Sequence, residues 1–127
     1  MTRCALALIA ASVFAGAADA QTVQRNFPAT ALRGEIAFGQ PPAIKLNGED
    51  ARLAPGSRIR ATNNLLQMSG ALVGQTATVN YTLDPTGLVL DVWLLSDDER
   101  ARQPWPRTLK DAQSWRFDPV AQIWTPR

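Results

Sequence analysis

Apolar and polar side chains alternate most clearly between residues 76 and 95. Two runs rich in β-branched and aromatic residues flank the segment Asp-Pro-Thr-Gly at positions 84–87. Aspartate suits the first position of a type I turn, proline suits the second, and Gly87 can adopt the left-handed conformation that follows the turn. The pattern therefore predicts a β-hairpin centred on this turn. The expected cross-strand pairs are Asp84 with Leu88, Leu83 with Val89, Tyr81 with Asp91, and Val79 with Trp93.

The second strand of this hairpin is apolar on both faces. One face carries alternate residues from Leu88 to Leu94, and the other carries Val89, Trp93 and Leu95. A strand that is apolar on both faces needs cover on both sides. We therefore expect a small β-barrel that is covered on the outside by a helix or a terminal segment.

Two further stretches have the period of two that is typical of strands. Residues 32–38 alternate, with Gly34 on the apolar face, where it indicates a bulge or a close approach of another segment. Asn47 and Gly48 stand between two short runs and predict a type I′ turn. The turn pairs Leu46 with Glu49, Lys45 with Asp50, and Ile44 with Ala51.

Residues 55–73 follow a less regular pattern. Pro55 and Gly56 predict a turn, after which residues 57–62 form a strand with Ile59 facing inward and Arg58 and Arg60 facing outward. The apolar stretch 65–73 fits either a strand with a loop or one helical turn. Its two glycines argue against a longer helix.

The character of the chain changes after residue 95. A capping box, Ser-Asp-Asp-Glu at 96–99, predicts a helix that ends before Pro104. Residues 108–112 predict a second helical turn. An Asp-Pro turn at 118–119 predicts a final hairpin that places Phe117 opposite Ile123.

Together these patterns predict one all-β domain over residues 29–127. We expect a small, partly open β-barrel of six to eight short strands, with one or two short helices after residue 96. A domain of this size buries about two-thirds of its unfolded surface and can be stable without disulfide bonds.

The first 28 residues are expected to lie outside this domain. Residues 1–20 have the features of a secretory signal peptide: Arg3 near the start, an apolar run, and a small-residue cleavage site that ends at Ala20. The apolar run is too short to span a bilayer well, and the alternative is a retained anchor helix. Residues 21–28 predict a flexible leader that Phe27 pins to the domain. The signal predicts export to the periplasm, with no integral membrane span in the mature chain.

The composition argues against the commonest catalytic and metal-binding chemistry. The chain has no histidine, and its one cysteine, Cys4, lies in the predicted signal peptide. Histidine is the usual general base, and nucleophilic triads need a base beside the nucleophile. Zinc and copper sites draw mainly on histidine and cysteine, and no glycine-rich phosphate loop is present. We therefore expect no catalytic residue, no metal and no cofactor.

Carboxylates are the only common catalytic groups left. Asp91 interrupts an apolar face, and it is either a strand-edge carboxylate bonded to Tyr81 or a nearby arginine, or the acid of a catalytic site. The three acids at 97–99 are explained by the helix cap. A net charge of +2 is too small to indicate binding to nucleic acid.

Two features favour a binding surface. Arg52, Arg58 and Arg60 share a face if their strands are neighbours, and that face suits an anionic partner such as a lipid phosphate or an acidic protein surface. The alternative is an ordinary solvated strand face. Trp105 stands between two prolines and is expected to be exposed. The tryptophans expected in the core are Trp93 and Trp115.

Three segments carry a resemblance to known proteins. They are Leu-Ala-Pro-Gly-Ser-Arg-Ile-Arg-Ala-Thr-Asn-Asn-Leu-Leu (53–66), Val-Asn-Tyr-Thr-Leu-Asp-Pro-Thr-Gly (79–87) and Asp-Val-Trp-Leu-Leu (91–95). These segments resemble uncharacterised small exported proteins of proteobacteria, which implies a periplasmic setting but no activity. The order of short strands also loosely resembles OB-type and SH3-like small barrels, which bind ligands on an open face.

We expect a non-catalytic periplasmic binding or accessory module that acts through protein or cell-envelope contacts. The expected contact surface contains Arg52, Arg58, Arg60 and Trp105. Two alternatives stay open: a carboxylate-dependent hydrolase that uses Asp91, and a structural component of an envelope complex. The expected partner is an envelope protein or an anionic surface rather than nucleic acid, and the oligomeric state is left open.

Overall fold

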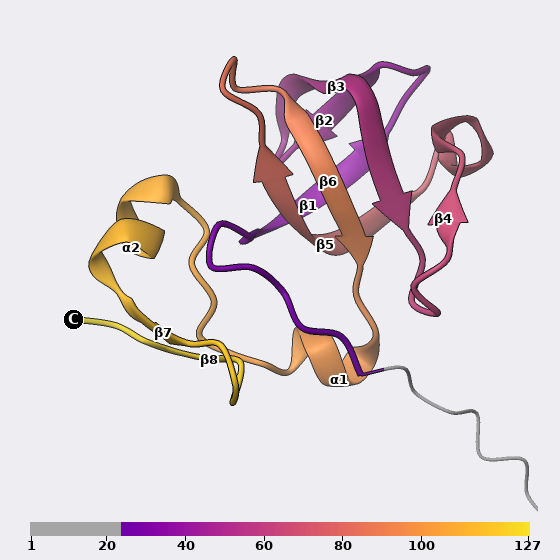
Figure 1. The fold of residues 1–127 in the computed structure, drawn as a ribbon. Coiled ribbons are helices and arrows are strands. Elements are labelled where there is room, and N and C mark those ends of the chain that lie inside the picture. Colours follow the sequence, from indigo (N-terminus) through magenta and orange to yellow (C-terminus); the bar gives the residue numbers. More distant parts are fainter. Residues whose placement is uncertain (1–23) are drawn as a thin grey trace, which may run out of the picture.

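The computed structural model describes residues 24–127. The predicted signal peptide, Cys4 and the start of the predicted leader lie outside the described residues. Residues 24–127 form eight strands: β1 (Leu32–Phe38), β2 (Ala43–Leu46), β3 (Glu49–Arg60), β4 (Leu66–Gln67), β5 (Thr76–Leu83), β6 (Val89–Leu94), β7 (Arg116–Asp118) and β8 (Ile123–Thr125). The helices are the 3₁₀ turn η1 (Ser69–Leu72), α1 (Asp97–Arg100) and α2 (Leu109–Ser114) (Figure 1).

Five strands form a barrel, which confirms the predicted all-β fold with short helices after residue 96. The order is β2-β1-β5-β6-β3, and pairing between β2 and β3 joins the two ends of this row. All pairs are antiparallel except β3 with β6, which are parallel. The barrel is therefore closed rather than partly open. Strand β4 lies outside the ring, beside β3.

The long strand β3 closes the barrel. We predicted a turn at Pro55 and Gly56, but β3 runs from Glu49 to Arg60 without turning back. Gly56 has φ +76°, and the pairing with β6 shifts between Leu53 and Arg58. The strand bends at this irregularity, so that its first half pairs with β2 and its second half with β6. The glycine supplies a bend rather than a turn.

The Asn47-Gly48 turn has the predicted register in all three pairs. Both turn residues have positive φ, 53° and 83°, as a type I′ turn requires. The 84–87 turn is also confirmed: the Asp84 N–H donates to the Leu88 carbonyl at 2.8 Å, and Gly87 has φ +87°.

The register that we predicted for the central hairpin matches the structure only beside the turn. Leu83 lies opposite Val89, but Tyr81 lies opposite Val92 instead of Asp91. A bulge between these pairs inserts one residue into β6, which reverses the faces that follow it. Val92 therefore points into the barrel and is fully buried, whereas Trp93 pairs with Asn80 on the outer face.

The barrel interior is filled by a cluster of aliphatic and aromatic side chains. Its fully buried members include Ile36, Val79 and Val92, and Leu72 of η1 covers part of it. The predicted close approach at Gly34 is confirmed, because a Cβ atom there would lie 2.9 Å from the Tyr81 ring.

A second core lies between the outer face of the barrel and the two ends of the described chain. It consists of Phe27, Ala31, Leu95, Trp105 and Trp124, with partly buried aromatic rings around them. Trp105 is only 5 % exposed, so the expectation that it is exposed was wrong. Trp93 and Trp115, expected in the core, are partly buried and pack against this second cluster.

The chain ends differ from the prediction in three details. Residues 24–28 are held against the domain by two buried side chains: Phe27 is 3 % exposed, as its predicted pinning role requires, and Arg25 is 5 % exposed. Helix α1 is shorter than expected. In the last hairpin Phe117 lies opposite Trp124, not Ile123. Among residues 24–127, no helix is both long and apolar enough to cross a bilayer.

Candidate functional site

A cleft lies between the outer face of the barrel and the segment that leads into α2. It has a volume of about 470 Å³, which falls within the range of roughly 300–1,000 Å³ that is typical of small-molecule sites. The residues that line it are Arg33, Thr78, Arg100, Gln103, Pro104, Trp105, Arg107, Asp111 and Trp115. Three of these side chains are guanidinium groups and only one is a carboxylate, so the cleft is positively charged.

Arg33 forms the back of the cleft. It belongs to β1 and points away from the barrel interior, but the C-terminal segment covers it, so that it is only 4 % exposed. Its Nε donates to the Asn80 Oδ1 atom at 2.8 Å. Its Nη atoms donate to the backbone carbonyls of Glu99, Arg100 and Arg102 at 3.2, 3.3 and 3.4 Å. These bonds fix the guanidinium group in one position.

The electrostatic surroundings of Arg33 are unfavourable for a cation. Burial, together with the charges of Arg107 and Arg102, lowers the pKa of Arg33 to about 10, although the charge of Glu99 acts in the opposite direction. Proteins usually place an opposite charge beside a buried cation. An anion bound in the cleft would supply additional negative charge at this place.

Arg107 stands at the mouth of the cleft. It follows Pro106, whose carbonyl accepts a hydrogen bond from the Arg33 backbone N–H at 2.8 Å. This bond holds the backbone beside Arg107 against β1. The residue is exposed. None of the ion pairs within residues 24–127 involves it. Arg100, in contrast, is paired with Asp97 and donates to the Leu95 carbonyl. Arg107 is therefore the guanidinium group available to a ligand.

Two indole rings form the apolar wall of the cleft. Trp105 is anchored by a hydrogen bond from its Nε1 to the Ala31 carbonyl at 3.0 Å, and the Arg33 guanidinium lies 5.2 Å from its ring centre. Trp115 is half-buried and follows the last residue of α2. The side chain of Thr108 caps the start of this short helix by accepting from the Asp111 N–H. The helix thus holds both Asp111 and Trp115 at the cleft.

A buried ion pair fixes the segment that carries the cleft. The Arg25 guanidinium donates from Nε to Glu99 Oε2 at 2.9 Å and from Nη2 to Oε1 at 2.5 Å, and both side chains are 3 % exposed. Arg25 also donates to the carbonyls of Ala61 and Leu94. Burial alone would raise the pKa of Glu99, but hydrogen bonds from Arg25 and Ser96 and the charge of Arg25 hold that pKa below its usual value.

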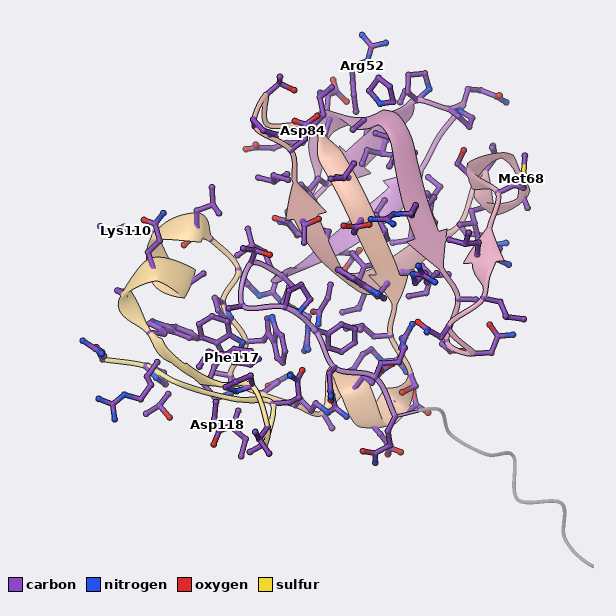
Figure 2. The ribbon with its side chains drawn as sticks, viewed as in Figure 1. Arg52, Met68, Asp84, Lys110, Phe117 and Asp118 are labelled. Atoms are coloured by element: carbon purple, nitrogen blue, oxygen red, sulfur yellow. The ribbon has the colours of Figure 1, made fainter. Side chains whose placement is uncertain are left out.

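The arginines singled out from the sequence lie elsewhere. Arg58 is 56 % exposed in its side chain and pairs with Asp91, and Arg60 donates to the Asn64 carbonyl at 3.3 Å. Arg52 lies in the first half of β3, before the bend, at the edge of the molecule (Figure 2). It lines a separate apolar groove with Leu53 and Leu88. Trp105 is the only one of the four predicted contact residues that lines the cleft.

Asp91 has the structural role that we considered for it, with an arginine rather than Tyr81 as its partner. Its Oδ1 accepts from Arg58 Nε at 3.1 Å, and its Oδ2 accepts from the Thr82 hydroxyl at 3.2 Å. Within residues 24–127, no three Asp, Glu, His or Cys side chains converge in a group that could hold a metal ion.

The cleft residues Arg33, Arg100 and Arg107 were missed from the sequence. One signal was present, because three arginines and one tryptophan occur within residues 100–107. This cluster indicates a cleft only after the structure has shown that residues 100–107 pack against β1. The burial of Arg33 has no local signal at all, since its covering segment lies far away in the sequence.

Comparisons with known proteins leave the family of the chain open. A scan against protein-family models, a search of curated proteins and a search of solved structures each found no significant match. The resemblance to small exported proteins stays a prediction. What the cleft can bind is therefore inferred from its own side chains.

Proposed function

We propose that the chain is a non-catalytic periplasmic binding or accessory module, and that the cleft takes a small anionic ligand with a carboxylate or phosphate group. The observation that carries the proposal is the position of Arg107, an exposed arginine without an acidic partner among residues 24–127, at the mouth of a cleft of suitable size. A guanidinium fork matches the geometry of carboxylate and phosphate oxygens and can donate two parallel hydrogen bonds.

The surroundings of Arg107 support this choice of ligand. Arg33 and Arg100 add positive charge, and Asp111 is the one acid that lines the cleft. Trp115 offers a partly exposed indole surface for an apolar or planar portion of the ligand. Ligand sites commonly combine such apolar walls with a few fixed polar groups.

The rigidity of the cleft also favours binding. The Arg33 side chain, the Trp105 ring and the Arg25–Glu99 pair are held by hydrogen bonds within the chain itself. A preformed site loses less conformational freedom on binding, which improves affinity for a given set of contacts.

The barrel topology is consistent with a binding role. A five-stranded ring with one parallel pair, β3 with β6, supports the proposed likeness to OB-type barrels, which use their surfaces to bind ligands. A fold does not define a ligand, however, so the cleft chemistry decides the ligand class.

A titration followed by tryptophan fluorescence tests the proposal. Inorganic phosphate and succinate are added separately, so that the phosphate and carboxylate arms are distinguished. We expect a saturable change with at least one of them, because Trp115 lines the cleft. Arg107→Gln should weaken binding about tenfold, since a hydrogen bond to a charged group contributes roughly 1.5–3 kcal/mol.

Arg52→Gln is the matched control, because it removes the same charge from another exposed arginine of the barrel. It should leave the affinity nearly unchanged. An equal loss of affinity in both variants would assign the effect to overall charge. A larger loss in Arg52→Gln, or no saturable signal in the parent protein, would contradict the proposed site.

The contact of an envelope partner with Arg52, Arg58 and Arg60 stays a prediction. Capture of partners from native periplasm tests it, with Arg58→Ala combined with Arg60→Ala. The double variant should capture less partner while its melting temperature stays nearly constant, since the Arg58 side chain is more than half exposed and such ion pairs contribute little to stability. Unchanged capture would contradict a role for these two arginines.

A further inference from the structure

Exposed apolar side chains gather in one short segment of the described chain. Four of the seven large apolar residues that are exposed belong to residues 65–73. Their exposed fractions are 65 % for Leu65, 62 % for Leu66, 79 % for Met68 and 40 % for Val73. We call residues 61–73, which include β4 and η1, the β4 tip. Figure 2 shows Met68 at the periphery of the molecule.

The exposure of these side chains is built into the fold. Leu66 and Gln67 pair with Arg60 and Ile59 at the end of β3. The turn is closed by two hydrogen bonds: the Ala61 N–H donates to the Leu65 carbonyl, and the Asn64 N–H donates to the Ala61 carbonyl. Near the end of the tip, Leu72 of η1 is 3 % exposed and packs into the barrel core. The segment is therefore held at both ends with its other aliphatic side chains outward.

The composition of the β4 tip fits a lipid surface better than a protein partner. No charged residue occurs from Ala61 to Leu83. Leu65 and Leu66 are adjacent, so they point to opposite faces of the ribbon, and both are more than half exposed. A flat protein partner would cover one face only. Protein hot spots also favour tryptophan, tyrosine and arginine over leucine and valine, whereas this tip contains no aromatic side chain.

Positive charge lies directly behind the tip. Arg60 is the backbone partner of Leu66, and none of the ion pairs within residues 24–127 involves it. Arg58 is two residues away and more than half exposed, although it is paired with Asp91. Each cationic side chain near an anionic bilayer contributes roughly 1 kcal/mol of attraction.

We propose that the β4 tip inserts into the boundary between headgroups and acyl chains of an anionic lipid bilayer, with Leu65, Leu66 and Met68 in the apolar layer and Arg60 at the lipid phosphates. The inserted hairpin turn brings its paired backbone groups with it, which limits the cost of entering an apolar medium. In Figure 1, β4 and η1 lie on the right of the barrel and α2 on the left. A docked molecule would thus leave the cleft beside α2 open to solvent.

Vesicle flotation tests this proposal without reference to the cleft ligand. The protein is mixed with vesicles of phosphatidylcholine and phosphatidylglycerol, and with vesicles of phosphatidylcholine alone. We expect binding to the mixed vesicles and weaker binding to the neutral ones. Leu66→Ser combined with Met68→Ser should weaken binding about a hundredfold or more, because burial of each aliphatic side chain contributes roughly 1.5–3 kcal/mol.

Leu109→Ser combined with Val120→Ser is the matched control, because these apolar side chains are also exposed but lie outside the tip. It should float as the parent protein does. All four sites are exposed, so the variants should fold, and circular dichroism checks this. An environment-sensitive dye on Met68→Cys, in a Cys4→Ser background, should shift to the blue with mixed vesicles, whereas the same dye on Val120→Cys should not.

Failure of this proposal is distinguishable from failure of the anion-binding proposal. Arg107→Gln should bind vesicles normally, and Leu66→Ser with Met68→Ser should bind the small anion normally. The membrane proposal is overturned if the parent protein does not float, or if the tip variant floats as well as the parent. It is also overturned if the tip variant instead dissociates a dimer of the parent protein in solution, which would make the tip a contact between copies of the chain.

Discussion

Arg25 and Glu99 form a two-point ion pair, 74 residues apart in the sequence, from which water is almost fully excluded. Arg25 comes from the segment before the barrel and Glu99 from helix α1, so the pair joins the N-terminal segment to the helix that follows the barrel. The same glutamate completes the capping box of α1 with Ser96. One carboxylate thus sets both the start of the helix and the attachment of the N-terminal segment.

Glu99→Gln should strongly destabilise the protein. It leaves the Arg25 guanidinium buried without a counter-charge, and breaking a buried pair in this way typically costs about 3–5 kcal/mol. Chemical denaturation measures the change in the free energy of unfolding. Asp97→Asn is the control, because the Asp97–Arg100 pair is exposed and should contribute about 1 kcal/mol or less. Similar losses in the two variants would contradict a buried, tightly coupled pair.

The free energy of unfolding should fall in acid partly because of Glu99. Its folded-state pKa lies below the ordinary value of 4.5, so the unfolded chain binds a proton more readily at low pH. The stabilisation is therefore complete above that ordinary value and is lost as the pH falls through the folded-state pKa. In denaturation experiments at a series of acidic pH values, the free energy of unfolding should fall less steeply with decreasing pH for Glu99→Gln than for the parent protein. Hydrogen bonds from Thr86 and from backbone amides lower the pKa of Asp84 as well, so some slope should remain. An acid slope identical to that of the parent would contradict the assignment to Glu99.

Gly34→Ala should destabilise the barrel. The new Cβ atom would lie 2.9 Å from the Tyr81 ring and 3.1 Å from Asn47 Oδ1, and forcing atoms into a packed core costs about 1–3 kcal/mol. Thermal and chemical unfolding measure the loss. Gly70→Ala is the matched control, since nothing lies within 4 Å of its Cβ position. That variant should be neutral or more stable by up to about 1 kcal/mol. Equal effects would argue against close packing at Gly34.

Two buried tryptophans should respond differently to replacement by phenylalanine. The Trp105 Nε1 donates to the Ala31 carbonyl at 3.0 Å, whereas the Trp124 Nε1 has no hydrogen-bond partner among the described residues. Trp105→Phe loses a hydrogen bond and leaves a carbonyl unpaired, so it should cost about 1 kcal/mol more than Trp124→Phe. The difference between the two unfolding free energies checks this, and a larger loss in Trp124→Phe would contradict it.

Turns and alternation were the most informative sequence signals. The Asn47-Gly48 turn defined its own register because a two-residue loop leaves little freedom for the flanking pairs. The 84–87 turn did the same for Leu83 and Val89, but the bulge in β6 lies further along and has no signature in residue type. One inserted residue moved Trp93 from the predicted inner face to the outer face. Period-two patterns identify a face only as far as the first bulge.

The second core and the cleft depend on long-range contacts that local patterns do not encode. Trp105 between two prolines looks like part of an exposed connector, yet Pro106 accepts a hydrogen bond from Arg33 and brings this segment onto β1. The same contact covers the outer face of β1 and buries Arg33, which is 4 % exposed. The one indication in the sequence was that β6 is apolar on both faces, which requires that another segment cover the outer face of the barrel.

The central claim is that Arg107 and its neighbours form an anion site beside α2. Two-dimensional ¹H–¹⁵N NMR during titration with inorganic phosphate, and separately with succinate, tests it most directly. We predict saturable shifts of the Arg107 and Thr78 amides and of the Trp115 indole N–H, all lost in Arg107→Gln. Saturable shifts confined to Arg52, Arg58 and Arg60, or no saturable shifts with either anion, would contradict the claim.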